Sequence, residues 1–244
     1  EEAARADGVR GVFLMPACAN PTTRTMRGAR RDALAQVARA RDLFVLEDDA
    51  QLGPEAESPL QARIPERTVY LAGTSRLLAA GLRATFAVVP ASLCARLLAA
   101  LHSTAIKASA LDAEILGELI LDGAAETLLE RKRAAARRAN AVFDAVFGRA
   151  GTTDDVRLFR TLPLPGTAGR GQEIERALRA HGIEVFHSDR FRVGTAPADS
   201  FLRISVSNAR SEKTLASHLR ALARKLKGGA PGDAPSASRF RTET

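Results

Sequence analysis

The sequence predicts an α/β fold, in which a mostly parallel sheet domain with helices is joined by a long helix to a small α+β domain. Short, nearly continuous apolar runs in the first ninety residues are typical of strands that are covered on both faces. A stretch of helical spacing, residues 26–41, separates the first two runs, and the order strand, helix, strand predicts a parallel pairing. After residue 151 short strands alternate with helices, which indicates a second domain.

The strands of the first domain are predicted at residues 9–16, 43–48, 68–73 and 83–90. The helix at 26–41 has an apolar side made of Ala33, Leu34, Val37 and Ala38. Its solvent side is made of Arg30, Arg31, Arg39 and Arg41. Further helices are predicted near 93–101, 111–119 and 124–147.

In the second domain, strands are predicted at 156–164, 183–186 and 201–206, and helices at 172–180 and around Leu215 to Leu226. We therefore divide the chain into a partial large domain (1–123), a long interdomain helix (124–150), a small α+β domain (151–228) and a tail (229–244). The Gly, Pro and Ser content of the tail predicts disorder.

The composition excludes several classes of protein. No apolar run approaches the length of a membrane span, and residues 1–5 show no signal-peptide core. The only two cysteines, Cys18 and Cys94, lie in apolar surroundings, so we expect reduced core residues in a cytoplasmic protein. The four histidines lack ligand-like spacing, which predicts no metal site.

The net charge of +8 allows two interpretations. A nucleic-acid partner is one, and solvated basic helix faces are the other. The second is favoured, because the basic clusters at 130–133 and 137–138 identify no groove-reading element.

Four short motifs carry the candidate chemistry. They are Pro-Ala-Cys-Ala-Asn-Pro-Thr at 16–22, Glu-Asp-Asp-Ala at 47–50, Gly-Thr-Ser-Arg at 73–76 with Gly-Leu-Arg at 81–83, and Leu-Arg-Ile-Ser at 202–205. Each motif by itself is an ordinary turn, cap or ion-pair pattern. Together, their order and spacing resemble the fold-type I pyridoxal-phosphate (PLP) aminotransferases of class I/II. Over residues 8–227 the sequence is most similar to the aminotransferase-like domains of MocR-type (GntR-family) regulators.

The resemblance implies a role for five residues. Asn20 would hydrogen-bond the phenolic oxygen of PLP, and Asp48 would pair with the pyridinium nitrogen. Ser75 and Arg83 would hold the phosphate. Arg203 would bind the carboxylate of an amino-acid or 2-oxo-acid ligand with its planar fork. The resemblance also implies a homodimer.

The sequence departs from the family at three places. Arg76 occupies the position of the Schiff-base lysine, and a guanidinium that stays protonated has no free amine to attack an aldehyde. The five lysines of the chain lie in other motifs, and none is an obvious substitute. Gln51 stands where many relatives carry a tyrosine that contacts the phenolic oxygen. The family's N-terminal phosphate-binding turn and ring-stacking aromatic are expected upstream of this sequence.

Three functions remain open at this point. The first is an active aminotransferase, which needs a lysine at position 76. The second is a catalytically degraded PLP-fold domain that binds PLP without a covalent link, as the effector module of a MocR-type regulator whose DNA-binding domain lies upstream. The third is a truncated, non-functional remnant.

Overall fold

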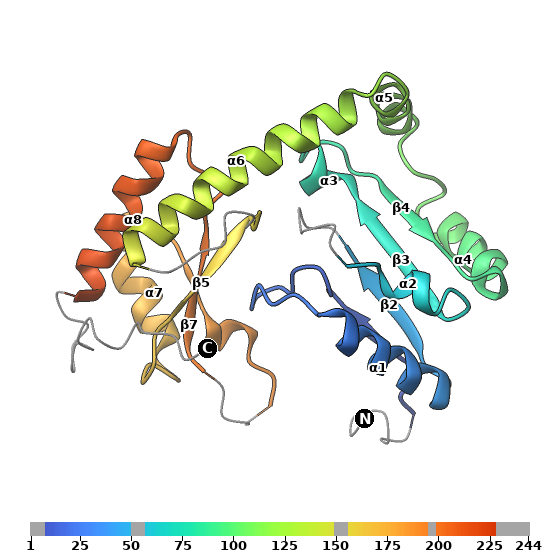
Figure 1. Ribbon diagram of the computed structural model, residues 1–244, viewed down its shortest axis with the longest axis horizontal. Coiled ribbons are helices and arrows are strands. Elements are labelled where there is room, and N and C mark those ends of the chain that lie inside the picture. The colour runs from blue at the N-terminus through green and yellow to red at the C-terminus, as the bar shows by residue number, and fades with distance from the viewer. Residues whose placement is uncertain (1–7, 50–56, 149–155, 195–198, 228–244) are drawn as a thin grey trace. The chain divides into compact units, whose positions relative to one another are not determined.

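The computed structural model describes residues 8–49, 57–148, 156–194 and 199–227 (Figure 1). The chain divides into two compact units. Unit 1 comprises Glu1–Asn20 and Arg24–Arg133, and unit 2 comprises Pro21–Thr23 and Ala134–Thr244.

Unit 1 contains a four-stranded sheet in the order β1-β2-β3-β4. Its strands are β1 (Gly11–Leu14), β2 (Phe44–Asp48), β3 (Thr68–Gly73) and β4 (Thr85–Val88). The pairs β1/β2 and β2/β3 are parallel, whereas β3/β4 is antiparallel. The predicted parallel pairing across the first helix is therefore confirmed.

Two helices cover one face of this sheet. They are α1 (Gly28–Ala40) and α2 (Leu60–Arg63). The core between helices and strands is aliphatic and consists of Ala35, Ala38, Leu43, Val45, Leu60 and Ile64. Burial of each larger side chain in this core, such as Leu or Ile, contributes roughly 1.5–3 kcal/mol to the stability of the folded state.

The opposite face of the sheet is open among the described residues, and the expectation of strands covered on both faces is wrong there. Phe13 and Leu46 are partners in the β1/β2 register, and their exposed fractions are 58% and 37%. All four residues of β4 are exposed as well. No described element of unit 1 packs over these side chains. The apolar character of a strand predicts a cover but does not show whether the chain supplies one.

The helix α1 is rotated relative to its prediction. Arg31, expected on the solvent side, is 2% exposed, whereas Ala33, expected in the apolar stripe, is exposed. The guanidinium of Arg31 donates to the carbonyl oxygens of Met26 and Ser58, both at 2.9 Å, and lies 3.8 Å from Oε1 of Glu47. A buried cation is tolerated here because its donors are satisfied and an anion faces it.

The rest of unit 1 is helical. After β3 comes the short helix α3 (Thr74–Leu77), and β4 is followed by α4 (Ala91–Thr104) and α5 (Ala110–Leu121). Cys18 is buried, but Cys94 on α4 is exposed, so the prediction of two core cysteines is wrong for Cys94. The long helix α6 (Ala124–Phe147) continues into unit 2.

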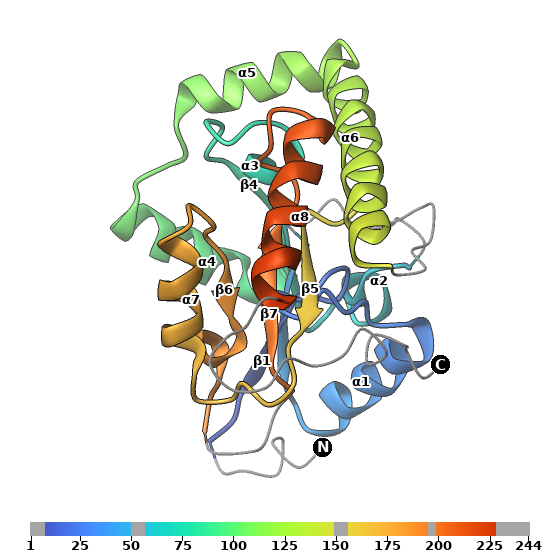
Figure 2. The same ribbon diagram turned by 90° about the vertical axis from the view of Figure 1, so that its left-hand side faces the viewer.

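Unit 2 contains an antiparallel three-stranded sheet in the order β5-β7-β6. Its strands are β5 (Phe159–Pro163), β6 (Phe186–His187) and β7 (Phe201–Ser205), and its helices are α7 (Gly171–Arg179), the 3₁₀ helix η2 (Ser188–Phe191) and α8 (Glu212–Lys227). Figure 2 shows α8 lying alongside α6, and an ion pair between Arg138 and Glu212 joins these two helices at 2.8 Å. The core includes Phe143, Leu162, Leu202 and Leu222.

A buried polar cluster ties α6 to β5. Arg160 forms two hydrogen bonds with the Asp144 carboxylate, at 2.6 and 3.2 Å, and a third with Asn140 at 3.0 Å. Its guanidinium also lies 4.8 Å from the ring centroid of Phe143. Such a pair specifies how the helix and strand dock, because a shifted register would leave buried charges unpaired.

Among the described residues, no helix combines the length and apolar character that crossing a bilayer requires.

Replacing Arg31 by alanine should destabilise the chain by about 2–4 kcal/mol, because Glu47 loses its buried cation and two carbonyls lose a donor. The matched control is Arg30→Ala on the same helix, whose side chain is exposed. We expect a change below about 0.5 kcal/mol for this control. Urea unfolding followed by circular dichroism measures both, and equal effects would contradict the assigned role of Arg31.

Candidate functional site

The candidate residues of unit 1 meet at one edge of its sheet. Asp48 is the last residue of β2, and Ser75 lies in α3, directly after β3. Because β2 and β3 are parallel, their carboxyl ends share an edge, as the pairing of Asp48 with Leu71 shows. Arg83 precedes β4, whose Thr85 pairs with Gly73 at this same edge. Open α/β sheets bind ligands at such an edge.

The end of β2 carries three consecutive carboxylates whose side chains differ in their surroundings. Glu47 is 1% exposed and accepts hydrogen bonds from the backbone N–H groups of Leu60 and Gln61, both at 3.0 Å. Side chains alternate along a strand, so Asp48 points to the face opposite Glu47. The buried carboxylate thus anchors the strand to the start of α2.

Asp49 belongs to the structural part of this edge. Its Oδ2 accepts a hydrogen bond of 2.8 Å from the hydroxyl of Tyr70, the only tyrosine in the sequence. Burial raises the pKa of Asp49, although the Tyr70 hydroxyl and Arg31 act in the opposite direction. Burial also raises the pKa of Glu47, against its two backbone hydrogen bonds and Arg31.

The Ser75 hydroxyl is held at the start of α3, in the connection between β3 and β4. Its Oγ donates to the carbonyl oxygen of Leu82 at 2.9 Å, and Nη1 of Arg83 lies 3.5 Å from the same Oγ. The neighbouring Thr74 also ties this connection together, because its Oγ1 donates to the carbonyl oxygens of Leu82 and Ala84, 3.0 and 2.8 Å away. The structure therefore brings Ser75 and Arg83 together, as expected for a pair that binds one anionic group.

Asn20 lies on a loop that follows β1, and its side chain is exposed. The loop closes through hydrogen bonds from the backbone N–H of Ala19 to the carbonyl of Arg24 and from that of Met26 to the carbonyl of Pro16, at 2.9 and 2.8 Å. This closure places Asn20 beyond the carboxyl end of β1, at the edge where β2 also ends.

Arg203 lies in unit 2, in the middle of β7. Its guanidinium sits 4.0 Å from the ring centroid of Phe159 on the neighbouring strand β5. It pairs in register with Thr161 of β5 on one side and Phe186 of β6 on the other. Gln51 lies outside the described residues.

The chain is similar in sequence to a transcriptional regulator and to a transaminase. No protein-family model matches the chain. Over 229 residues, 93% of the chain, it is 30% identical to an uncharacterized HTH-type transcriptional regulator of Bacillus subtilis, YdeF. Over 155 residues it is 28% identical to 2-aminoadipate transaminase of Thermus thermophilus. The match covers 49% of the regulator and 39% of the transaminase, so the chain spans half the length of these curated relatives or less.

Solved structures decide the fold. The α-aminoadipate aminotransferase LysN of Thermus thermophilus, complexed with N-(5'-phosphopyridoxyl)-L-leucine, superposes with a TM-score of 0.77 at 25% identity, over 89% of this chain and 59% of LysN. An aromatic aminotransferase of Pyrococcus horikoshii superposes with a TM-score of 0.79 at 18% identity, over 93% of this chain and 62% of its own. The chain has the fold of the fold-type I aminotransferases. The resemblance predicted from the four motifs is thereby confirmed.

Within this aminotransferase fold, Arg76 lies on α3, next to Ser75, and its side chain is exposed. A lysine reaches this position, although no pattern in the sequence indicates the contact: Nζ of Lys132 on α6 donates to the backbone carbonyl of Arg76 at 2.9 Å. Burial lowers the pKa of Lys132. The contact joins the carboxyl end of α3, where a positive charge is favourable, to the long helix. It binds the main chain at position 76 and does not replace the missing side-chain amine.

The described residues hold no group of three His, Cys, Asp or Glu side chains arranged to bind a metal ion. The hydroxyl and the guanidinium of this aminotransferase-like edge suit an anionic group of an organic ligand, whereas the carboxylate suits a protonated ring nitrogen.

Replacing Asp49 by asparagine should raise the melting temperature at neutral pH. The folded pKa of this carboxyl lies above its ordinary value of 3.8. The folded state therefore binds the proton more strongly than the unfolded state, and the charged carboxylate weakens folding as the pH rises through the folded pKa. The gain from Asp49→Asn should vanish in acid, where the wild-type carboxyl is protonated in both states.

The matched variant Tyr70→Phe should have the opposite effect, because it removes the hydroxyl that donates to Asp49 and costs about 1 kcal/mol at neutral pH. Thermal melts of both variants across the acid range provide the measurement. A lower melting temperature for Asp49→Asn at neutral pH would contradict this account of the edge.

Proposed function

We propose that this chain is a ligand-binding module of the aminotransferase fold that holds PLP, or an adduct of PLP with an amino acid, without a covalent link. The observation that carries the proposal is the contrast at one sheet edge. Asn20, Asp48, Ser75 and Arg83 retain the chemistry for recognition, while position 76 lacks the amine for catalysis. The similarity to an HTH-type regulator supports a role as the effector module of a MocR-type regulator, in the cytoplasm.

The residues of unit 1 fit such a ligand. The Ser75 hydroxyl and the Arg83 guanidinium, 3.5 Å apart, offer a donor and a charge to a phosphate. The Asp48 carboxylate at the end of β2 would hold a proton on a pyridinium nitrogen, and Asn20 would donate to a phenolic oxygen. PLP, when bound, supplies a ring that withdraws electrons from an attached amino acid.

Arg76 separates binding from covalent chemistry. A guanidinium stays protonated at all accessible pH and has no lone pair with which to attack an aldehyde. It still adds a positive charge beside Ser75, which favours a phosphorylated ligand. Arg203 of unit 2 would bind the ligand's carboxylate, because its planar fork suits the carboxylate of an amino acid or a 2-oxo acid. Gln51 would donate a hydrogen bond in place of a tyrosine hydroxyl.

As the effector module of a regulator, the chain must pass ligand binding on to a second copy of itself and to a DNA-binding domain. We infer a homodimer, in which ligand occupancy changes the arrangement of two modules, and DNA binding through a domain outside this chain. The transaminase relative favours a second candidate, an active aminotransferase that converts an amino acid and a 2-oxo acid. Position 76 decides between the two.

The affinity for PLP should fall by roughly ten- to a hundred-fold in Asp48→Asn, because a charge-assisted hydrogen bond to the ring nitrogen is lost. The neighbouring Asp49→Asn is the matched control and should change the affinity less than about two-fold, since its partner is Tyr70. Calorimetric titration of the folded variants measures both. Equal losses, or none, would refute the assignment of Asp48.

Reduction with borohydride in the presence of PLP should give no adduct at position 76, as found by peptide mass. The exposed Lys107 provides the background level for non-specific reaction. Arg76→Lys should acquire an adduct at position 76, because a lysine amine can attack the aldehyde. Robust turnover by this single variant would show that the chain contains a complete catalytic site and would favour the second candidate.

A further inference from the structure

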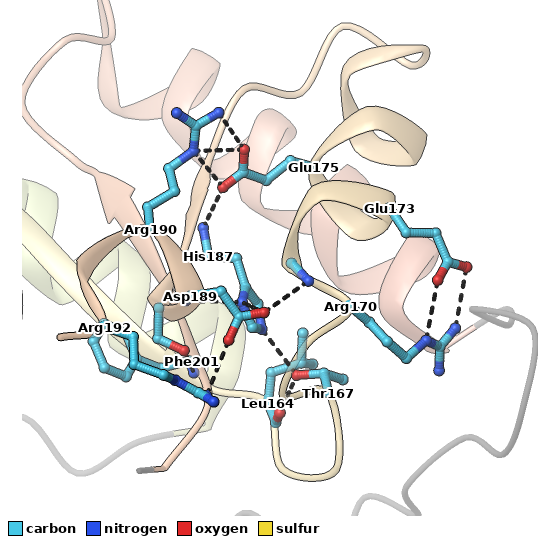
Figure 3. A network of polar contacts seen from close by, with 12 residues as sticks. Leu164, Thr167, Arg170, Glu173, Glu175, His187, Asp189, Arg190, Arg192 and Phe201 are labelled. Carbon is cyan, nitrogen blue, oxygen red and sulfur yellow. Dashed lines mark hydrogen bonds and ion pairs between the residues drawn. The ribbon is translucent and has the colours of Figure 1, made fainter. Parts of the chain in front are cut away.

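The imidazole of His187 lies at the centre of a polar network in unit 2 (Figure 3). Its side chain is fully buried, and its two ring nitrogens meet different partners. Nε2 lies 3.0 Å from Oγ1 of Thr167, and Nδ1 lies 3.2 Å from the backbone nitrogen of Asp189. The main chain of Gly171 packs against the ring so closely that a Cβ there would lie 2.5 Å from Nδ1.

These partners determine where the neutral ring carries its proton. The single hydroxyl hydrogen of Thr167 points to the carbonyl oxygen of Leu164, 2.6 Å away, because a carbonyl can only accept. Oγ1 of Thr167 must then accept from Nε2–H of His187. The other nitrogen, Nδ1, is left with a lone pair, and it accepts from the backbone N–H of Asp189.

His187 is thereby the N-cap of η2. An N-cap offers an acceptor to a backbone N–H of the first turn. Only the neutral imidazole can do this through Nδ1. A proton on Nδ1 would remove the acceptor and donate instead to Oδ2 of Asp189, which lies 3.2 Å away. The backbone N–H of Asp189 would then lose its partner.

Four charged side chains surround the ring. Asp189 lies in η2, and Glu175 on α7 accepts from the backbone N–H of His187 at 2.7 Å. Arg190 is paired with Glu175 at 2.6 Å, and Arg192 with Asp189 at 3.0 Å. Burial is the largest influence and lowers the pKa of His187 below its ordinary 6.5, although Asp189 and Glu175 raise it. The cap is therefore formed at neutral pH and lost in acid.

The cap is connected to the strand that carries Arg203. Oγ of Ser188, the first residue of η2, accepts from the backbone N–H of Phe201, the first residue of β7, at 3.1 Å. The strand β6 also pairs with β7, with Phe186 opposite Arg203. A change in η2 thus acts on β7 at its first residues.

We propose that neutral His187 is a positioning residue that holds η2 and the start of β7 in place, and that acid releases this segment and weakens the hold of Arg203 on a ligand carboxylate. The second half rests on the proposed function, in which Arg203 binds that carboxylate. The first half is a property of unit 2 alone.

The test of the first half is hydrogen exchange at the amides of Asp189 and Phe201, measured by NMR on the whole chain from about pH 7.5 down to the pH at which the ring signals of His187 report its protonation. After correction for intrinsic exchange, we expect protection to fall about five-fold in acid, the effect of losing one N-cap. The control His187→Asn keeps a good capping acceptor but does not titrate in this range. Its protection should stay constant, and a wild-type protein without the fall would overturn the proposal.

The ring itself provides a measurement that needs no variant. At neutral pH, NMR should find the proton on Nε2, and a ring protonated on Nδ1 instead would overturn the assignment of the cap. For the second half, the affinity for N-(5'-phosphopyridoxyl)-L-leucine should fall at least about five-fold more in acid than the affinity for PLP, which lacks the carboxylate. Equal falls would overturn the connection to Arg203. No binding of either ligand at neutral pH would refute the proposed function and leave the cap standing.

Discussion

The buried carboxylate of Glu47 is the constraint on which the candidate site depends. It accepts two backbone hydrogen bonds from the start of α2 and faces the Arg31 guanidinium of α1, so one side chain joins both helices to β2. A shift of β2 by one residue would put this carboxylate on the open face and Asp48 in the core. The energetic cost of an unpaired buried charge makes that shift unfavourable. Glu47 is held on the helix side of the sheet, and Asp48, the next residue along the strand, therefore points away from the helices.

In the proposed function, recognition and catalysis separate at this same edge. Binding an anionic, planar ligand needs donors and charges at the ends of strands, and these are properties of a hydroxyl, an amide, a carboxylate and a guanidinium. Covalent catalysis needs one more property, a lone pair on nitrogen, and only position 76 of the family's pattern supplies it. An arginine there leaves the first set intact. The regulator relative and the aminotransferase structures are both consistent with such a module.

Much of the fold could be predicted from the sequence, because continuous apolar runs and one helical stretch are strong signals of a parallel sheet. The errors have physical causes. The helical pattern predicts Arg31 in solvent, because a single helix does not reveal the Glu47 carboxylate on β2 that faces it. The apolar helix around Cys94 predicts a covering partner, but the pattern does not show whether the chain contains one. The open face around Phe13 and Leu46 has the same origin.

The candidate site was predictable to the extent that it depends on order along the chain. Ser75 and Arg83 are eight residues apart in one motif, and Nη1 of Arg83 lies 3.5 Å from Oγ of Ser75. The contact of Lys132 with position 76 spans 56 residues and follows from how α6 packs, which no local pattern records. The sequence around His187 lacks the spacing of a metal ligand and predicts no role for its side chain. Its role as a cap depends on Thr167 and Gly171, which reach it only in the folded unit.

The most direct test of the central claim is the absorption spectrum of PLP during titration of the protein, followed by dialysis. If recognition persists without a covalent link, PLP should bind saturably, keep the spectrum of the free aldehyde, and leave completely on dialysis. A stable imine band that survives dialysis would contradict the separation of binding from catalysis, and an absence of saturable binding would contradict the recognition site itself.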